Sequence, residues 1–299
     1  MDPMHCIVLD LLARFCVADY SYARLRGEKA TARGGELAYS CIEQFQQWNG
    51  VSIYSQIAGR GLPVYLLHSL GGTARHWQFT MPALAAANCR VTAIDLPGHG
   101  RSGLSEGSLT PRRMGADLAR SLSSPAVLVG NSLGGWVALQ AYLHRPDRVL
   151  GICLVASAGL AGMPVRPPKL RLAPGASNLL EMLLASVFHH PERIDPLVQQ
   201  SVLGGIAAPA LLRLAPEGTL SPADLRRVRC PVLILWGEND QILPVHWAES
   251  FARHLGAYKK TILPDCGHLP QIECAERFNR ELIAFTGVFQ SATLNPASQ

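Results

Sequence analysis

The pentapeptide Gly130-Asn131-Ser132-Leu133-Gly134 lies between an apolar run at 126–129 (AVLV) and a helix-like run at 135–141 (GWVALQA). A Gly-x-Ser-x-Gly motif between a strand and a helix predicts a sharp, strained turn that exposes the serine hydroxyl. Side chains two residues before and two residues after the serine would collide there, so both positions favour glycine. The helix directs its first N–H groups and its positive dipole end at the same place. The motif therefore predicts that Ser132 is a nucleophile beside an oxyanion site.

Two later segments provide a base and an acid for this serine. The run at 232–240 (VLILWGEND) predicts a buried strand that ends in a loop carrying Asp240. His268 follows the short predicted strand at 260–263, in a Gly-His-x-Pro loop. A serine alcohol needs a base within hydrogen-bond reach, and an imidazole suits that role. A carboxylate would orient the imidazole and stabilise its protonated form. We therefore predict a triad of Ser132, His268 and Asp240.

The order Ser132, Asp240, His268 along the chain is that of the α/β-hydrolases. On these motifs, over about residues 43–287, the chain resembles the α/β-hydrolase superfamily, in its serine esterase and carbon–carbon hydrolase branch. The resemblance implies an α/β fold with a mostly parallel central sheet flanked by helices, and a helical cap insertion. It implies neither a metal nor an organic cofactor. Dehalogenases and epoxide hydrolases of this fold carry aspartate at the position of Ser132, so a serine there points to acyl transfer through an acyl-enzyme.

The acid and the base each have a rival. Glu238 lies two residues before Asp240, but Asp240 matches the Gly-x-x-Asp spacing of the family. Some members carry the acid after the preceding strand, and here that loop, 156–159, has no carboxylate. His99 lies in the segment 95–102 (DLPGHGRS), which matches a structural loop of the family. We therefore favour Asp240 and His268. His189 and His190 fall in the predicted cap, outside any expected triad position.

Two backbone N–H groups are expected to form the oxyanion hole. One belongs to Leu133, the residue after the nucleophile. The resemblance assigns the other to Leu70, in the loop His68-Ser69-Leu70-Gly71-Gly72. The family usually shows His-Gly-x-Gly there, so Ser69 departs from the pattern at the first glycine. His68 matches a position that is usually structural.

Strands and helices are expected to alternate along the chain. Asn49-Gly50 between two alternating runs predicts a β-hairpin. Met114, Leu118 and Leu122 have the spacing of one helix face. Such an alternation predicts a mostly parallel sheet covered on both faces. Its apolar runs fall at 64–68, 91–95, 126–129, 150–155, 232–235 and 260–263.

The chain is expected to divide into a hydrolase core with one insertion. Residues 43–158 and 229–288 form the predicted core. The insertion at 159–228 starts with four prolines and continues as leucine-rich helices, and it is the predicted cap. A minority of its apolar side chains should face the cleft, which would make the pocket apolar. Residues 1–42 are a leader of uncertain order and 289–299 a polar tail.

The composition is that of a globular enzyme. The 299 residues are 48% hydrophobic and 16% charged, which argues against disorder. The net charge of +5 is mild and scattered, so we expect no nucleic acid partner. A basic cluster at Arg166, Lys169 and Arg171 is interpreted as a solvated loop. The eight cysteines form no Cys-x-x-Cys pair, which disfavours a zinc or redox motif and fits a reducing, cytoplasmic location.

The apolar N-terminal run at 6–17 is interrupted by Asp10 and Arg14 and lacks a basic region before it. It is therefore not expected to be a signal peptide, and it is too short to span a bilayer. Two interpretations stay open: an amphipathic helix that lies on the protein or on a membrane, and translation that starts further along the chain.

The leading functional hypothesis is a serine carboxylesterase that acts on small to medium apolar esters. The second is a carbon–carbon hydrolase of vinylogous diketones, because that family often shows Gly-Asn-Ser, as at 130–132. Its Gly-Pro-rich oxyanion loop is absent from 68–72, so this hypothesis ranks second. Lactonases and thioesterases share the triad. A hydrophobic small-molecule receptor on the same fold is the alternative of a different class. The oligomeric state is not predicted.

Overall fold

The computed structural model describes residues 41–163, 179–204 and 209–294. The predicted leader therefore lies almost entirely outside the described residues, as do the basic cluster at 166–171 and the cap's opening prolines. Within the described residues, no helix is long and apolar enough to cross a membrane.

An eight-stranded sheet forms the centre of the molecule, with strand order β1-β2-β4-β3-β5-β6-β7-β8. Strands β3 to β8 are parallel, and β1 and β2 add an antiparallel edge. The strands are β1 (Ile42–Trp48), β2 (Val51–Ala58), β3 (Leu62–Leu67), β4 (Cys89–Ile94), β5 (Ala126–Asn131), β6 (Val149–Val155), β7 (Val232–Gly237) and β8 (Tyr258–Leu263). The predicted mostly parallel sheet is confirmed, and so is the hairpin, in which Trp48 pairs with Val51 around Asn49-Gly50.

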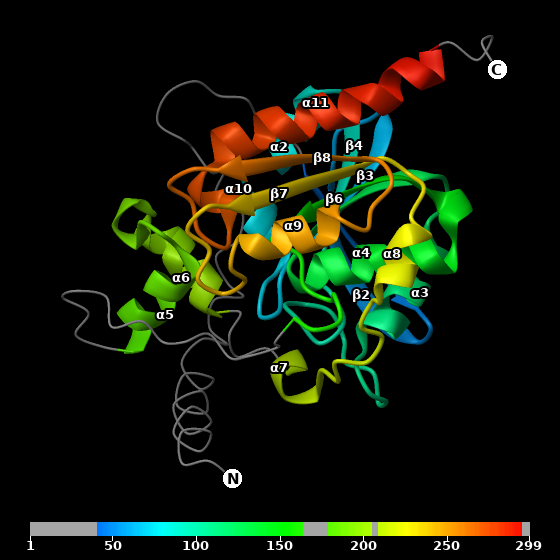
Figure 1. Cartoon of the computed structure of the whole chain (residues 1–299). Coiled ribbons are helices and arrows are strands. Elements are labelled where there is room, and N and C mark those ends of the chain that lie inside the picture. Colours follow the sequence, from blue (N-terminus) through cyan, green and yellow to red (C-terminus); the bar gives the residue numbers. More distant parts are fainter. Residues whose placement is uncertain (1–40, 164–178, 205–208, 295–299) are drawn as a thin grey trace.

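Both faces of the sheet are buried under helices. Along β5, Ala126 and Leu128 pack into one apolar cluster, while Val127 and Val129 pack into the other. Successive strand residues point to opposite faces, so a strand buried on both sides needs a continuous apolar run. Figure 1 shows α11 (Ala275–Leu294) and α2 (Met81–Ala86) on one side of the sheet, and α3 (Pro111–Ser121), α4 (Leu133–His144), α8 (Pro222–Arg226) and α9 (His246–Ala252) on the other. The predicted helix face is confirmed for Met114 and Leu118, which are buried in one cluster. Leu122 is buried in the same cluster, but it is the C-cap residue just after the helix.

The helices that cover the sheet vary widely in length. Helix α11 continues into the segment predicted as a tail, to Leu294. The helices that pack beside the sheet also include α10 (Pro270–Glu273) and the 3₁₀ helices η2 (Ala74–Trp77) and η3 (Pro146–Arg148).

The insert helices are α5 (Leu179–Val187), α6 (Pro196–Gly204) and α7 (Ala210–Arg213), with the 3₁₀ helix η4 (Pro191–Arg193). Figure 1 shows α5 and α6 beyond the carboxyl ends of β7 and β8. Leu184 and Phe188 pack there against Leu269 and Ile272, which lie just after β8. The insert therefore has a small apolar core, separate from the two clusters of the sheet, and the loop and helix that follow β8 contribute to it.

Candidate active site

Ser132 lies in a strained turn between β5 and α4. Its backbone has φ 53° and ψ −110°, a conformation that a non-glycine residue adopts only where its surroundings impose it. Those surroundings are hydrogen bonds to β6 and the loop after it. The Ser132 amide donates to the Val155 carbonyl over 2.9 Å, and the Ser132 carbonyl accepts from the Ala158 amide over 3.0 Å. The side chain is half-buried, at the carboxyl end of the central strand.

The two glycines of the pentapeptide are required by close backbone contacts. A Cβ on Gly130 would lie 2.2 Å from the backbone of Gly134. A Cβ on Gly134 would lie 2.1 Å from the Leu67 carbonyl oxygen and 2.9 Å from that of His68. The predicted collision is therefore confirmed. The first turn of α4 also lies against the end of β3, where the loop with Leu70 begins.

Asp240 and His268 form a buried pair. Nδ1 of His268 lies 2.8 Å from Oδ2 of Asp240. Oδ1 of Asp240 accepts from the amides of Ile242 and Leu243 over 2.8 and 2.9 Å. Both oxygens of the carboxylate are thus engaged, which fixes its orientation. Because the carboxylate accepts at Nδ1, the neutral imidazole carries its proton there and Nε2 keeps a free lone pair.

Asn131 connects the turn of Ser132 to the histidine loop, which is the segment 264–269 between β8 and α10 that carries His268. Its Nδ2 donates to the Val155 carbonyl over 3.1 Å and to the His268 carbonyl over 3.2 Å. The residue before Ser132 therefore bonds to the backbone of the proposed base. Within the described residues, no hydrogen bond joins the Ser132 hydroxyl to the imidazole of His268. The sequence analysis missed this role of Asn131, which no motif could show.

Among the described residues, neither the rival acid nor the rival base is hydrogen-bonded to the ring of His268. Within the described residues, Glu238 makes no hydrogen bond to the imidazole of His268, which is bonded to Asp240. His99 is buried under the loop after β4, where its Nδ1 lies 3.1 Å from the Pro97 carbonyl oxygen. His189 and His190 lie between α5, which ends at Val187, and the 3₁₀ helix η4.

The two expected oxyanion donors have free amides and lie on adjacent segments. In the part of the chain that the structure describes, no backbone hydrogen bond uses the N–H of Leu133 or Leu70. The Gly72 amide donates to the Ser69 carbonyl over 2.8 Å, and Gly71 has φ 73°. These features are those of a type II turn, which requires glycine at its third residue and leaves the N–H of its second residue unbonded. The loop is thus ordered although Ser69 replaces the family's first glycine.

Three buried histidines lie under this turn: His68, His76 and His99. Nδ1 of His68 lies 2.7 Å from the Ser69 carbonyl oxygen, and its Nε2 accepts from the Leu96 amide over 2.8 Å. Burial lowers the pKa of His68 well below its usual value, with a further contribution from His99. His68 is therefore a neutral residue that holds the turn. The sequence predicted a structural role for it, but no signal pointed to its neighbour His76.

One group of described residues has ligand atoms for a metal close together: His189, His190 and Asp265. It lies beside the loop that carries His268, and none of its members belongs to the predicted triad. The described cysteines are Cys41, Cys89, Cys153, Cys230, Cys266 and Cys274, and all six are free thiols.

Comparison with known proteins gives this geometry a context. The alpha/beta hydrolase family matches residues 64–281. The chain is 35% identical over 241 residues to the dihydrolipoyllysine-residue acetyltransferase component of the acetoin cleaving system of Pseudomonas putida. That alignment covers 75% of this chain but only 63% of the relative's length.

Two further relatives are covered over most of their length. The pimeloyl-[acyl-carrier protein] methyl ester esterase of Neisseria meningitidis is 29% identical, with 72% of this chain and 90% of the relative aligned. The structure of 2-hydroxy-6-oxo-6-phenylhexa-2,4-dienoate hydrolase from a Rhodococcus species superposes with a TM-score of 0.66 at 26% identity, covering 82% of this chain and 98% of that chain. An esterase and a carbon–carbon hydrolase are thus both among the similar proteins.

Proposed function

The chain belongs to the alpha/beta hydrolase family, and we propose that it is a serine hydrolase that cleaves esters of small to medium apolar acids or alcohols. The observation that carries this proposal is the 2.8 Å hydrogen bond between His268 Nδ1 and Asp240 Oδ2. It lies on a loop that Asn131 joins to the residue before Ser132. A nucleophile, a base and an orienting carboxylate on adjacent strand ends are what acyl transfer requires.

In the proposed mechanism, the Ser132 oxygen attacks the ester carbonyl while its proton passes to His268 Nε2. Asp240 keeps the imidazole in place and stabilises its positive charge. The N–H groups of Leu133 and Leu70 bind the oxyanion of the tetrahedral intermediate. His268 then gives the proton to the departing alkoxide, which leaves an acyl-enzyme. Water repeats the sequence at the acyl-enzyme, releases the acid and returns the proton to Ser132.

The insert supports an apolar substrate. Met182 and Leu183 on α5 are half-buried, whereas Leu184 and Phe188 belong to the insert's own core. Incompletely buried apolar side chains beyond the strand ends suit an apolar acyl or alcohol group. We propose that the insert is the cap of the family. We also place the enzyme in the cytoplasm, which is consistent with free thiols.

A carbon–carbon hydrolase is the second candidate. It is favoured by the Gly-Asn-Ser sequence at 130–132 and by the likeness to the Rhodococcus hydrolase, whose name gives a 2-hydroxy-6-oxo-dienoate substrate. The name of the Pseudomonas relative gives acetyl transfer to a dihydrolipoyllysine residue, so transfer of an acyl group to an acceptor other than water is a third candidate.

The test is steady-state hydrolysis of p-nitrophenyl esters, from acetyl to palmitoyl, by wild type and Ser132→Ala. We expect Ser132→Ala to lower kcat by about 10³-fold or more, because the nucleophile is lost while the fold is kept. Ser124→Ala, at an exposed serine, is the matched control and should keep wild-type turnover. The chain-length optimum would give the size of the pocket.

Two results would reject the ester proposal. One is ester turnover that survives Ser132→Ala. The other is wild type that hydrolyses no ester but cleaves a 2-hydroxy-6-oxo-dienoate, which would establish the second candidate. Tight binding of an apolar ligand with at most one turnover would instead indicate a receptor.

A further inference from the structure

The end of α5 and the histidine loop lie against each other, joined by one direct hydrogen bond and by two further bonds through Glu273 on α10. The His268 amide donates to the Val187 carbonyl over 2.8 Å. The carboxylate of Glu273 joins the two segments, because it accepts from the His190 amide and from the Gly267 amide, each over 2.6 Å. A Cβ on Gly267 would lie 2.6 Å from the Val187 carbonyl oxygen, so only glycine permits this approach. These contacts hold the two segments in one relative position.

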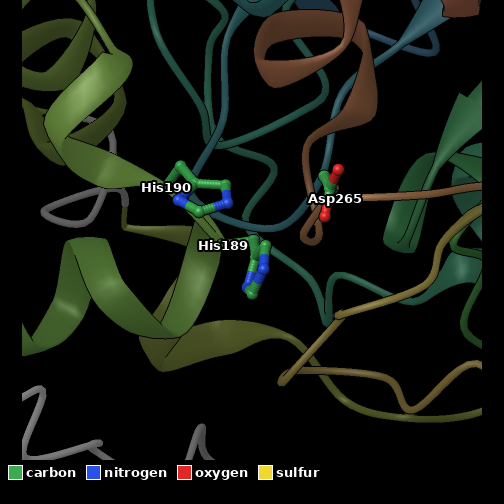
Figure 2. Close-up of side chains that lie close together, drawn as sticks. All are labelled: His189, His190 and Asp265. Carbon is green, nitrogen blue, oxygen red and sulfur yellow. The ribbon is translucent and has the colours of Figure 1, made fainter.

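Three metal-ligating side chains meet at this junction. Figure 2 shows His189 and His190 at the end of α5, and Asp265 on the loop across from them. One ligand atom of each lies within 4.8 Å of the others, and the two imidazole centroids are 4.2 Å apart. Both histidines are half-buried and Asp265 is exposed, so an ion from solvent has access. Asp265 has φ 52°, a left-handed conformation that aspartate tolerates better than most residues.

A second carboxylate prepares one of these histidines for metal binding. Nδ1 of His190 lies 2.9 Å from Oε1 of Glu192. A carboxylate that accepts from one imidazole nitrogen holds the proton there and leaves the other nitrogen as a ligand. A carboxylate in this place is the usual outer partner of a metal-bound histidine.

We propose that His189, His190 and Asp265 bind a divalent transition metal ion, of which Zn²⁺ is the best fit. Two imidazole nitrogens, one carboxylate oxygen and a water suit tetrahedral zinc. Ligand bonds of about 2.0–2.1 Å place tetrahedral ligand atoms roughly 3.3 Å apart, so the side chains must close by at most about 1.5 Å, which side-chain rotation can supply. The bound ion would join the insert to the loop of His268, three residues after Asp265. Metal binding at these three side chains does not depend on whether the protein hydrolyses esters.

The test is titration of the full chain, purified without a histidine tag, with Zn²⁺ alone, followed by calorimetry and by thermal unfolding. Wild type is expected to bind one Zn²⁺ ion. His189→Gln and Asp265→Asn should each bind Zn²⁺ at least about 100-fold more weakly, because loss of even an outer partner lowers metal affinity by about 10–100-fold. Saturating Zn²⁺ should raise the Tm of wild type by about 5 °C at a free concentration of roughly 100 times Kd. The same shift should be missing in both variants.

Further variants separate this site from other ligands. His144→Gln, at an exposed histidine on α4, should bind Zn²⁺ as wild type does. Glu192→Gln keeps all three ligands and should weaken binding by about tenfold. Co²⁺ bound at this site should give a spectrum without thiolate charge transfer, because its ligands are nitrogen and oxygen. Circular dichroism without metal shows whether each variant folds, and Asp265→Asn decides the matter if His189→Gln does not fold.

The proposal is overturned if wild type takes up no Zn²⁺, or if both ligand variants bind it with wild-type affinity. A cobalt spectrum dominated by thiolate charge transfer and unchanged in Asp265→Asn would also overturn it, because it would place the metal on cysteines. In each of these cases the three side chains would be a polar contact of the insert and nothing more.

Discussion

At the scale of single residues, His76 is the most unusual side chain near the proposed site. It is buried, and within the described residues neither of its ring nitrogens has a hydrogen-bond partner. Burial, with a smaller contribution from His99, lowers the pKa of His76 to about 4 from a usual value of 6.5. His68, by contrast, has partners for both nitrogens. Protonation of His76 in the folded state is therefore unfavourable, which makes the free energy of unfolding depend on pH.

This depressed pKa predicts a loss of stability in mild acid that His76→Leu should reduce. Below pH 6.5 the unfolded chain binds a proton that folded His76 rejects down to pH 4, so stability falls with pH across that window. Between pH 7 and pH 5 this single group should lower the free energy of unfolding by about 2 kcal/mol. Urea unfolding at both pH values should therefore show a smaller decrease in His76→Leu than in wild type. Equal decreases in the two proteins would contradict the prediction, with exposed His144→Leu as the control.

The sequence predicts residues of the proposed site where chemistry and local spacing coincide. The pentapeptide around Ser132 indicates its strained turn because the glycines are a local requirement. The bond from Asn131 to the His268 carbonyl spans 137 residues, and such a contact depends on how strands are ordered in the sheet. The surroundings of His76 also depend on a distant segment, because its neighbour His99 lies in the loop after β4. Roles that depend on distant partners leave no periodic signal.

At the scale of elements, α11 shows how a long helix buries one side against the sheet and leaves the other in solvent. Phe278 and Leu282 are fully buried in the cluster that also contains Trp77. The rings of Phe278 and Trp77 have centroids 6.2 Å apart. Val288, on the same helix, is 60% exposed. The helix thus offers a buried and an exposed apolar position for direct comparison.

Truncation at the buried position should be strongly destabilising. Phe278→Ala removes a fully buried ring and leaves a cavity, so it should lower the free energy of unfolding by about 3–5 kcal/mol. Val288→Ala on the same helix should change it by less than about 0.5 kcal/mol, because its side chain is already in water. Urea denaturation of both variants measures the difference. Similar values for the two would mean that α11 does not pack on the sheet as described.

Strands are better predicted than short helices, and the reason is physical. A strand such as β5 is buried on both faces, so its continuous apolar run is visible in the sequence. Helices such as α10 (Pro270–Glu273) and α7 (Ala210–Arg213) are each one turn long and have no periodicity to detect. Their positions depend on the neighbours they pack against, which the sequence alone does not identify.

At the scale of the whole molecule, the insert and the sheet are joined where the proposed base lies. Glu273 on α10 accepts from amides on both sides of this junction, one at the end of α5 and one beside His268. The apolar contacts of Leu184 and Phe188 with Leu269 and Ile272 support the same junction. The predicted boundaries of the cap at 159 and 228 remain a prediction, because part of the insertion lies outside the described residues.

Glu273 should therefore control how firmly the insert is held on the core. In Glu273→Gln only one oxygen remains to accept, so one of the two amides faces an NH₂ group and loses its partner. Hydrogen bonds to a charged group contribute about 1.5–3 kcal/mol, so local opening of the junction should become at least about tenfold more frequent. Hydrogen exchange should accelerate at the amides of His190, Gly267 and His268, while the amides of β5 keep their wild-type protection. Glu276→Gln, whose side chain is 91% exposed, is the matched control and should change neither set. Faster exchange throughout the sheet in Glu273→Gln would show instead that insert and core open as one unit, because the junction would then be part of the global core.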